Sequence, residues 1–418
     1  MREFFREKGF KKGGIVMRRL PIIFIAIGLI IIGCGLFEVM AQETFKLGIP
    51  VPLSGTKKNF GELIRGGALI ALEEINARGG FTKGVLRGKK LELSFEDTVG
   101  KPEKAEEIAR KFITEDQYPI IIGAYSSSCS LAVAEVSAEH GIPYLCQTGS
   151  TDKLTQQGWK NVFRLNPSSS QYITGLNDFL VTVVKPKTMA ILYEPTAYGK
   201  SLSEVMREFC AKKGIKIVYD EAYEPKQTDY KPMLIKVKHQ KPDVIFMISY
   251  IMDAILLMKQ ARELDINPKI FSGGAAGFVV PEFPEGAGQA AEYVVTSALW
   301  APGVKYPGAR EFTEKFRARY GSEPTYHAVE GYALVYATVD ALERTVSLSP
   351  EDIIAALKKT DMMTSFGPVK FEDFENFTNQ NRIPTLLMQV QDGQLVTIWP
   401  KEAAETRYRY PVPKWSAR

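Results

Sequence analysis

Short apolar runs alternate with segments of helical periodicity along most of the chain, and this alternation constrains the fold more than any other feature. Apolar residues alternate over 45–51, which predicts a strand, and helical spacing over 62–76 predicts the helix that follows. The unbroken run 120–122 predicts a strand buried on both faces, as in a parallel sheet covered by helices. The alternation restarts beyond Pro167 and predicts further strands at 189–193, 215–219 and 244–248. The sequence therefore predicts two doubly wound α/β units of similar size.

The length of the chain agrees with two domains. Its 418 residues are too many for one ordinary hydrophobic core. Near the C-terminus, helical spacing predicts helices at 312–320, 328–344 and 353–359. Closing strands are predicted at 369–371, 386–391 and 395–399. The segment 400–418 is polar and has no apolar periodicity, so we expect it to be a loosely held tail.

The N-terminal region has the pattern of an export signal. Met17 and two arginines precede an uninterrupted apolar run over 20–37, and Ala41 ends a small-residue cleavage site. We therefore expect 1–41 to be a signal peptide with an upstream extension, with Met17 as the true start and cleavage after Ala41. Two alternatives stay open, namely an uncleaved anchor and a lipobox-like stretch that would leave Cys34 lipidated and the protein tethered.

Charge and cysteine usage argue against several classes of partner. The formal net charge is +5, but basic residues concentrate at the two ends, so no basic face for nucleic acid is implied. Cys129, Cys146 and Cys210 follow the cleavage site, and the absence of a C-x-x-C pair argues against a zinc site or a redox pair. We expect buried free thiols, with a Cys129–Cys146 disulfide as the alternative.

Catalytic motifs are missing from the sequence. The turn 199–201 looks like the end of a phosphate-binding loop, but Glu194 stands where that loop requires glycine. No nucleophile elbow of the G-x-S-x-G type occurs. The three histidines are far apart in sequence, which argues against a metal cluster; they are His140, His239 and His327. We therefore expect no enzyme activity, no metal and no cofactor.

Hydroxyl side chains follow two neighbouring strands at the point where each strand ends. Ser127 and Ser128 come after the strand at 120–122, and Thr148 and Ser150 come after the next strand. Ligands of doubly wound sheets collect beyond the carboxyl ends of the strands. Free backbone N–H groups at a helix start, with hydroxyls beside them, suit a carboxylate or another anion. The alternative is that these hydroxyls only cap helices.

Two tyrosines occupy equivalent places in the second unit. Tyr198 follows one predicted strand and Tyr250 follows another. A tyrosine offers a flat apolar wall and one hydroxyl, which suits a lid over a small ligand. The alternative is ordinary partial burial, which is the better explanation for each tyrosine taken separately. Lys57, Lys58 and Phe60 follow the first strand and are expected near the rim of the same cleft, with the lysines in a solvated loop.

Several segments together resemble one family. FKLGIPVPLSG, GGALIALEEINARGG, IIIGAYSSSCS and the turn around Tyr198 resemble the leucine/isoleucine/valine-binding family of type I periplasmic binding proteins, in order from Phe45 to Trp399. The resemblance implies two Rossmann-like lobes joined by three crossover strands, near 166–168, 295–297 and 369–371. It implies an N-terminal lobe of 43–166 with 297–369, and a C-terminal lobe of 167–296 with 370–399.

The resemblance also implies roles for the candidate residues. Ser127, Thr148 and Ser150, with Ser128 beside them, match positions that hold a ligand carboxylate, and Tyr198 and Tyr250 match the aromatic wall. The acid that pairs with the ammonium group of an amino acid is missing, because Ala275 stands at its position. An unpaired buried ammonium is costly. Either another acid, for example Asp253 or Glu194, replaces the missing one, or the ligand has no ammonium group.

These observations together predict a binding protein. We expect a monomeric, non-catalytic, extracytoplasmic solute-binding protein of an ABC importer of the branched-chain amino acid type, located in the periplasm or anchored through Cys34. Its expected partners are a small carboxylate-bearing ligand and a membrane permease, with no nucleic acid. Alternative ligands are amides, urea-like solutes and aromatic acids, and an alternative role is a ligand-sensing receptor domain.

Overall fold

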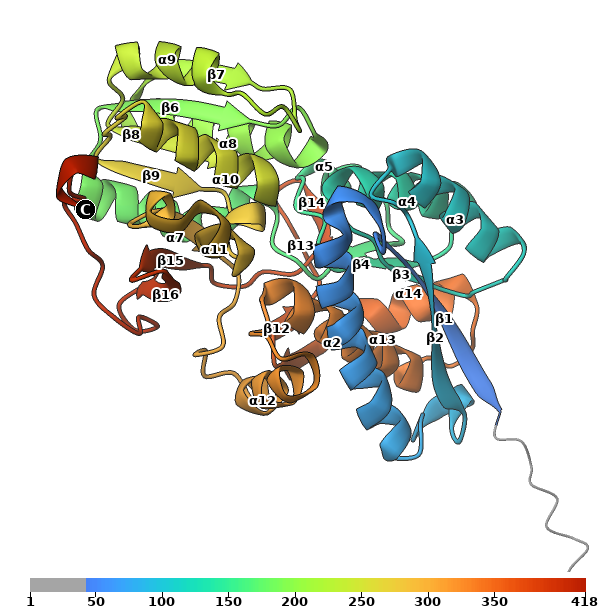
Figure 1. Ribbon diagram of the computed structural model, residues 1–418. Helices are drawn as coiled ribbons and strands as arrows, with labels where there is room; N and C mark the ends of the chain where they lie inside the picture. The colour runs from blue at the N-terminus through green and yellow to red at the C-terminus, as the bar shows by residue number, and fades with distance from the viewer. Residues whose placement is uncertain (1–42) are drawn as a thin grey trace, which may run out of the picture. The chain divides into compact units, whose positions relative to one another are not determined.

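Two seven-stranded sheets form the frame of the protein (Figure 1). The computed structural model describes residues 43–418, so the predicted signal segment, with Cys34 and the cleavage at Ala41, lies outside the described residues. The strand orders are β13-β14-β5-β4-β3-β1-β2 and β16-β15-β10-β9-β8-β6-β7. The first sheet with its helices is called the first lobe here, and the second sheet with its helices the second lobe. The predicted pair of doubly wound α/β units is confirmed.

The first lobe contains the early strands and a late return of the chain. Its strands are β1 (Thr44–Val51), β2 (Lys90–Asp97), β3 (Ile121–Gly123), β4 (Tyr144–Cys146), β5 (Val162–Arg164), β13 (Glu372–Phe374) and β14 (Phe377–Gln380). Its helices are α2 (Lys58–Ala77), α3 (Pro102–Thr114), α4 (Ser127–His140), α5 (Lys153–Gln156), α12 (Ala309–Tyr320), α13 (Tyr326–Arg344) and α14 (Pro350–Lys358). A small hairpin of β11 (Asp361–Thr364) and β12 (Gly367–Lys370) completes it.

Helices cover both faces of the first sheet. Because successive side chains of a strand point to opposite faces, Ile121 packs with α3 and α4, whereas Ile120 and Ile122 belong to the core that includes α2 and α13. The helices α2 and α13 approach very closely at Gly67, where an added Cβ atom would lie 1.7 Å from the carbonyl oxygen of Ala328. The apolar run 120–122 is therefore buried on both sides, as its composition predicts.

The second lobe repeats the same pattern. Its strands are β6 (Thr188–Tyr193), β7 (Lys216–Ala222), β8 (Val244–Ile248), β9 (Ile270–Gly273), β10 (Val295–Ala298), β15 (Leu386–Gln391) and β16 (Gln394–Trp399). Its helices are α6 (Ser169–Tyr172), α7 (Thr174–Phe179), α8 (Ala197–Lys213), α9 (Lys231–Gln240), α10 (Ile251–Glu263) and α11 (Glu282–Ala287). All five residues of the central strand β8 are buried, and the β6–β10 strands are parallel.

The chain passes between the sheets three times, but two of the predicted crossover positions are wrong. The first crossing follows β5, as expected. Residues 295–297 lie within β10 of the second sheet, so that crossing comes later, over 299–308. Residues 372–380, predicted in the C-terminal lobe, form β13 and β14 of the first sheet, and the last crossing is 381–385. The sequence of β13 and β14 has no apolar alternation that would predict these strands. Their place in the first sheet depends on the pairing of β14 with β5.

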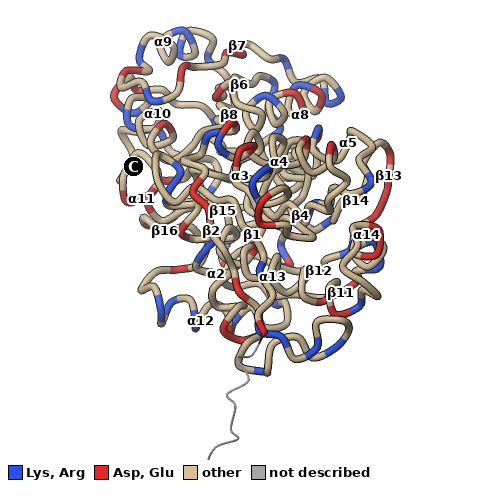
Figure 2. The backbone as a smooth tube through the Cα atoms, turned by 90° about the vertical axis from the view of Figure 1, so that its right-hand side faces the viewer, with Lys and Arg blue, Asp and Glu red and all other residues tan. Residues whose placement is uncertain are grey.

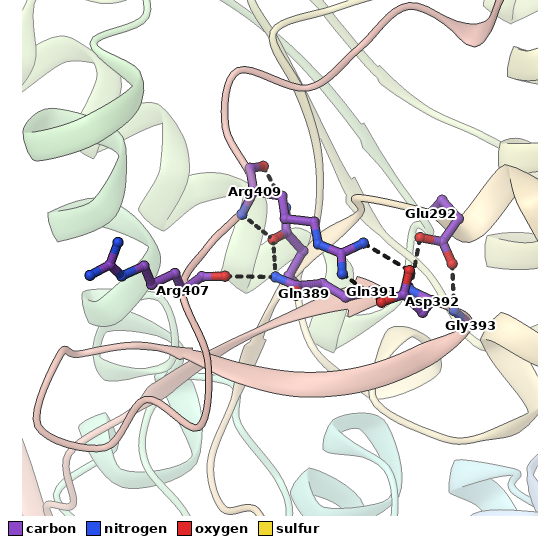
Figure 3. Close-up of polar contacts among 7 residues, drawn as sticks. All are labelled: Glu292, Gln389, Gln391, Asp392, Gly393, Arg407 and Arg409. Carbon is purple, nitrogen blue, oxygen red and sulfur yellow. Dashed lines mark hydrogen bonds and ion pairs between the residues drawn. The ribbon is translucent and has the colours of Figure 1, made fainter. Parts of the chain in front are cut away.

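The C-terminal segment 400–418 is fastened to the second lobe, so the prediction of a loosely held tail is wrong. The buried side chain of Gln389 accepts from the Arg409 N–H at 2.8 Å, and that of Gln391 donates to the Arg407 carbonyl at 3.0 Å (Figure 3). The Arg409 guanidinium also pairs with Asp392 (Figure 3). The Trp415 indole donates to the Ile266 carbonyl at 2.6 Å. Main-chain hydrogen bonds to buried amides leave no periodic pattern in the sequence.

The cysteines, the distribution of charge and the hydropathy of the helices can be compared with the expectations from composition. Cys129, Cys146 and Cys210 are buried free thiols, which confirms the first expectation and excludes the Cys129–Cys146 disulfide. Lys and Arg are interspersed with Asp and Glu along the chain in the view of Figure 2. Within residues 43–418, no helix is long and apolar enough to cross a membrane.

Removing the Trp415 side chain should show how firmly the tail is held. We expect Trp415→Ala to lower the free energy of unfolding by about 1–3 kcal/mol, because a half-buried aromatic contact and one hydrogen bond are lost. Urea denaturation measures this change. Glu402→Ala, at an exposed position of the same segment, is the control and should stay within about 0.5 kcal/mol of the wild type. Equal stability of the two variants would mean that the tail is loose after all.

Candidate ligand-binding site

A small cavity lies between the two lobes, beyond the carboxyl ends of the central strands. Its volume is ≈ 20 Å³, which is room for little more than one water molecule. Ten residues line it: Tyr125, Ser126, Ser127, Thr148, Ser150 and Tyr326 from the first lobe, and Tyr172, Tyr198, Tyr250 and Ala276 from the second. The structure thus brings together five residues singled out in the sequence, namely Ser127, Thr148, Ser150, Tyr198 and Tyr250.

Ser127 is the centre of the polar side of this cavity. Its Oγ atom accepts from the backbone N–H groups of Ser150 at 3.1 Å and Thr151 at 3.3 Å, and lies 3.4 Å from the Ser150 Oγ atom. The buried Thr148 Oγ1 atom has no hydrogen-bond partner among the described residues. Ser126, the N-cap residue of α4, makes no side-chain capping bond. The Ser126 hydroxyl therefore does not cap α4, and together with those of Ser127, Thr148 and Ser150 it forms a polar wall whose hydroxyl groups suit an anion.

A buried arginine beneath the cavity fixes the 149–151 loop. The Arg164 Nη1 atom donates to the carbonyl oxygens of this loop, at 3.1 Å from Gly149, 2.9 Å from Ser150 and 2.6 Å from Thr151. Its other nitrogens donate to the Thr155 and Gln380 side chains. Complete burial lowers the pKa of Arg164 to about 10, so the side chain stays charged at neutral pH.

The sequence analysis does not predict a role for Arg164. The only signal is a charged residue at the end of a short strand that is otherwise apolar. The carbonyl oxygens of the 149–151 loop point toward the Arg164 guanidinium. The N–H groups of Ser150 and Thr151 in this loop point toward Ser127.

Two tyrosines of the second lobe form the opposite wall. Tyr198 lies in the first turn of α8, where Thr196 caps the helix by accepting from the Gly199 N–H at 3.2 Å. The Tyr198 hydroxyl donates to the Gly274 carbonyl at 2.5 Å, which orients the ring. The centroid of that ring lies 5.7 Å from the centroid of Tyr250, the N-cap residue of α10. Both rings are thus held by helix starts that follow strands.

Lys57 and Phe60 reach the site more directly than expected. The Lys57 Nζ atom donates to the Ser126 Oγ atom at 3.1 Å and lies 4.5 Å from the ring centroid of Tyr250, in the other lobe. Burial lowers the pKa of Lys57, but the electrostatic effects of Tyr250, Cys129 and Glu194 outweigh it and the net shift is upward. The Phe60 ring packs against Tyr125 and Tyr250. The expectation that Lys57 lies in a solvated loop is therefore wrong, because this lysine bridges the two lobes.

Two buried acids lie behind the tyrosine wall. Glu194 accepts from the Tyr250 N–H at 3.1 Å, and burial together with the neighbouring Asp253 raises its pKa to about 8. Asp253 accepts from the Tyr230 hydroxyl at 2.7 Å. Neither acid lines the cavity. The two acids named as examples of a substitute are therefore engaged in contacts within the second lobe.

Two residues from the sequence analysis, Ser128 and Ala275, do not line the cavity. The half-buried Ser128 accepts from the Ala197 N–H at 3.4 Å, which is a contact between the lobes. Ala275 is buried, with φ of 67°, and its N–H donates to Thr296 Oγ1, so the next residue, Ala276, faces the cavity instead. Phe278, which could have offered an aromatic face, packs against Phe283 in the core.

A larger depression of ≈ 520 Å³ lies beside the cavity and shares Tyr326 with it. Four prolines, Trp300, Met388 and three glutamates are among its lining residues. None of the sequence-predicted site residues lines it. Within residues 43–418, no cluster of three or more His, Cys, Asp or Glu side chains could hold a metal ion. The buried His327 has its pKa lowered by burial to about 3 and is neutral.

Comparison with known proteins identifies the family. A family model described as periplasmic binding protein matches residues 44–394. The chain belongs to the periplasmic binding protein family. The Leu/Ile/Val-binding protein homolog 8 of Brucella melitensis is 28% identical over 405 residues, which cover 91% of this chain and 98% of that protein.

Solved structures share the fold of this periplasmic binding protein. A leucine-binding protein from Thermotoga maritima has a TM-score of 0.77 at 23% identity, over 85% of this chain and 97% of that one. A solute-binding protein of an ABC transporter from R. palustris, in complex with benzoate, has a TM-score of 0.73 at 19% identity, over 87% of this chain and 99% of that one. The resemblance to type I periplasmic binding proteins and the two-lobed fold are thereby confirmed.

Replacing Arg164 should weaken this periplasmic binding protein strongly. We expect Arg164→Met to lower the free energy of unfolding by about 3 kcal/mol or more, because several buried carbonyl groups lose their donor. Amide hydrogen exchange at Ser150 and Thr151 should accelerate along with the drop in the urea midpoint. The control Arg87→Met removes an exposed arginine of the same lobe and should change neither quantity. Unchanged exchange in Arg164→Met would contradict the assigned role.

The raised pKa of Glu194 should appear in the pH dependence of stability. The folded protein keeps this proton at pH values where the unfolded chain has lost it. The free energy of unfolding should therefore fall as the pH rises from about 4.5 to 8, by at most about 1.4 kcal/mol per pH unit. We expect Glu194→Gln to gain stability relative to the wild type between pH 5 and pH 8, as followed by urea denaturation. Glu224→Gln, at an exposed site, should give no such gain, and parallel pH curves for all three proteins would contradict the assignment.

Proposed function

We propose that this protein is the extracytoplasmic solute-binding component of an ABC importer of the branched-chain amino acid type. It captures a small carboxylate-bearing organic solute between its lobes and delivers it to a membrane permease. The observation that supports this function is the cluster of N–H and hydroxyl groups around Ser127, which faces Tyr198 and Tyr250 across the cavity. Donors of this kind suit a carboxylate, and the rings suit its apolar body.

Binding requires the lobes to separate. The cavity of ≈ 20 Å³ is far smaller than an organic solute. Contacts between the lobes close its surroundings: the Asn59 amide donates to Glu282 at 3.0 Å, and the Asp152 N–H donates to the Ser201 Oγ atom at 3.1 Å. A solute enters when these contacts open and is enclosed when the lobes close around it. Ligand contacts to both lobes supply the difference in affinity that favours the closed state.

The names of relatives support a carboxylate as the recognised group. The neighbour from Thermotoga maritima is a leucine-binding protein, and the neighbour from R. palustris holds benzoate. Leucine and benzoate have a carboxylate in common and differ in the rest of the molecule. In this proposal the protein acts as a monomer in the periplasm, or anchored there through Cys34, and binds its solute without catalysis or a cofactor.

Alanine at two serines tests the proposed anion site. We expect the double variant Ser127→Ala with Ser150→Ala to bind a carboxylate solute about 10 to 100 times more weakly, because hydrogen bonds to a charged group are lost. Isothermal titration calorimetry measures the affinity, with a solute first identified by thermal shift. A solute at 100 times its dissociation constant should stabilise the fold by about 2.7 kcal/mol.

The control for this experiment is Ser137→Ala, on the same helix as Ser127 but outside the cavity lining. Its hydroxyl has no hydrogen-bond partner among the described residues, so the affinity should not change. Unchanged affinity in the double variant would contradict the proposed site, and far-UV circular dichroism establishes that each variant is folded.

A further inference from the structure

The lining of the cavity contains no acidic side chain. Five of its ten residues are tyrosines, four carry Ser or Thr hydroxyls, and the last is Ala276. A ligand ammonium group enclosed there would meet hydroxyl oxygens and ring faces without a carboxylate. Burial of a cation without a paired anion is strongly unfavourable. A carboxylate group, in contrast, meets hydroxyl donors, because the Ser127 Oγ atom already accepts the N–H groups of Ser150 and Thr151 and keeps its own proton to donate.

Glu194 and Asp253, the two acids nearest the tyrosine wall, are engaged in contacts within the second lobe. Glu194 accepts the Tyr250 N–H and has the neighbouring Asp253, which raises its pKa so that it is largely protonated at neutral pH. Asp253 accepts from the Tyr230 hydroxyl and from the Lys226 N–H at 3.1 Å. Glu330 is fully buried outside the cavity lining, and burial raises its pKa well above the usual range.

A positively charged side chain, Lys57, contacts residues that line the cavity without lining it itself. The Lys57 Nζ atom contacts two of the lining residues, with a hydrogen bond to Ser126 and a cation–π contact to Tyr250. The electrostatic effects of Tyr250, Cys129 and Glu194 raise its pKa, so the ammonium group of Lys57 stays charged at neutral pH. A second ammonium group in the same small space would face like-charge repulsion, whereas an anion would be attracted.

We propose that the cavity selects a small carboxylate with a flat aromatic body and no ammonium group, and that Lys57 determines this selectivity. The inference rests on the proposed function and names its class of solute. Offset and edge-to-face contacts with the rings of Tyr125, Tyr198 and Tyr250 favour an aromatic over an aliphatic body. Lys57 supplies the charge that balances the ligand carboxylate and disfavours an ammonium group.

Two pairs of compounds test the ammonium group alone. 3-Phenylpropanoate differs from phenylalanine, and 4-methylpentanoate differs from leucine, only in lacking the ammonium group. By calorimetry on the full chain, we expect each acid to bind at least tenfold more tightly than its amino acid, and 3-phenylpropanoate more tightly than 4-methylpentanoate. Tighter binding of leucine or phenylalanine, with dependence on Ser127, would overturn this inference and leave the proposed function standing. No binding of any of the four compounds at millimolar concentration would overturn both.

Substitution of the lysine tests its role. We expect Lys57→Gln to reduce the ratio of the two affinities within each pair by at least fivefold, and Lys57→Arg to keep most of the ratio. Lys58→Gln, at the exposed neighbouring position, is the matched control and should leave the ratio unchanged. An unchanged ratio in a folded Lys57→Gln variant would show that Lys57 does not determine selectivity and would overturn that part of the inference.

Discussion

The buried guanidinium of Arg164 connects the ligand site to the hinge of the molecule. It donates to three carbonyl oxygens of the 149–151 loop and to the side chain of Gln380, whose amide in turn donates to the Asn166 carbonyl at 2.8 Å. Asn381 continues this network by donating to the Leu165 carbonyl. Two crossing segments are therefore tied together directly beneath the site. Burial of a charge is costly unless its hydrogen bonds are satisfied, and this network satisfies those of the guanidinium.

Neither lobe makes the site by itself. The first lobe supplies donors for an anion, and the second supplies aromatic walls that α8 and α10 hold in place. In the proposed function the lobes open and close, and a solute contributes to that change through contacts on both sides. Lys57 is part of this arrangement because it extends from the first lobe to a ring of the second.

Periodicity predicted the fold where the pattern is local. The strands β1, β3 and β8 and the helices between them follow from apolar spacing, and Ser127, Thr148 and Ser150 follow from the rule that ligands collect at strand ends. The features that the sequence does not predict depend on contacts between residues far apart in the chain. The place of β14 depends on its pairing with β5, the tail on main-chain bonds to Gln389, and the role of Lys57 on a ring of the other lobe. No local pattern carries these contacts.

A crystal structure of the protein with 3-phenylpropanoate or another bound carboxylate would test the central claim, that the solute lies between the lobes, most directly. The account predicts the carboxylate within hydrogen-bonding distance of Ser127 and Ser150, with the rest of the solute against the rings of Tyr198 and Tyr250 and the lobes closed around it. A solute located in the larger depression beside Trp300, or on the surface of a single lobe, would contradict the account.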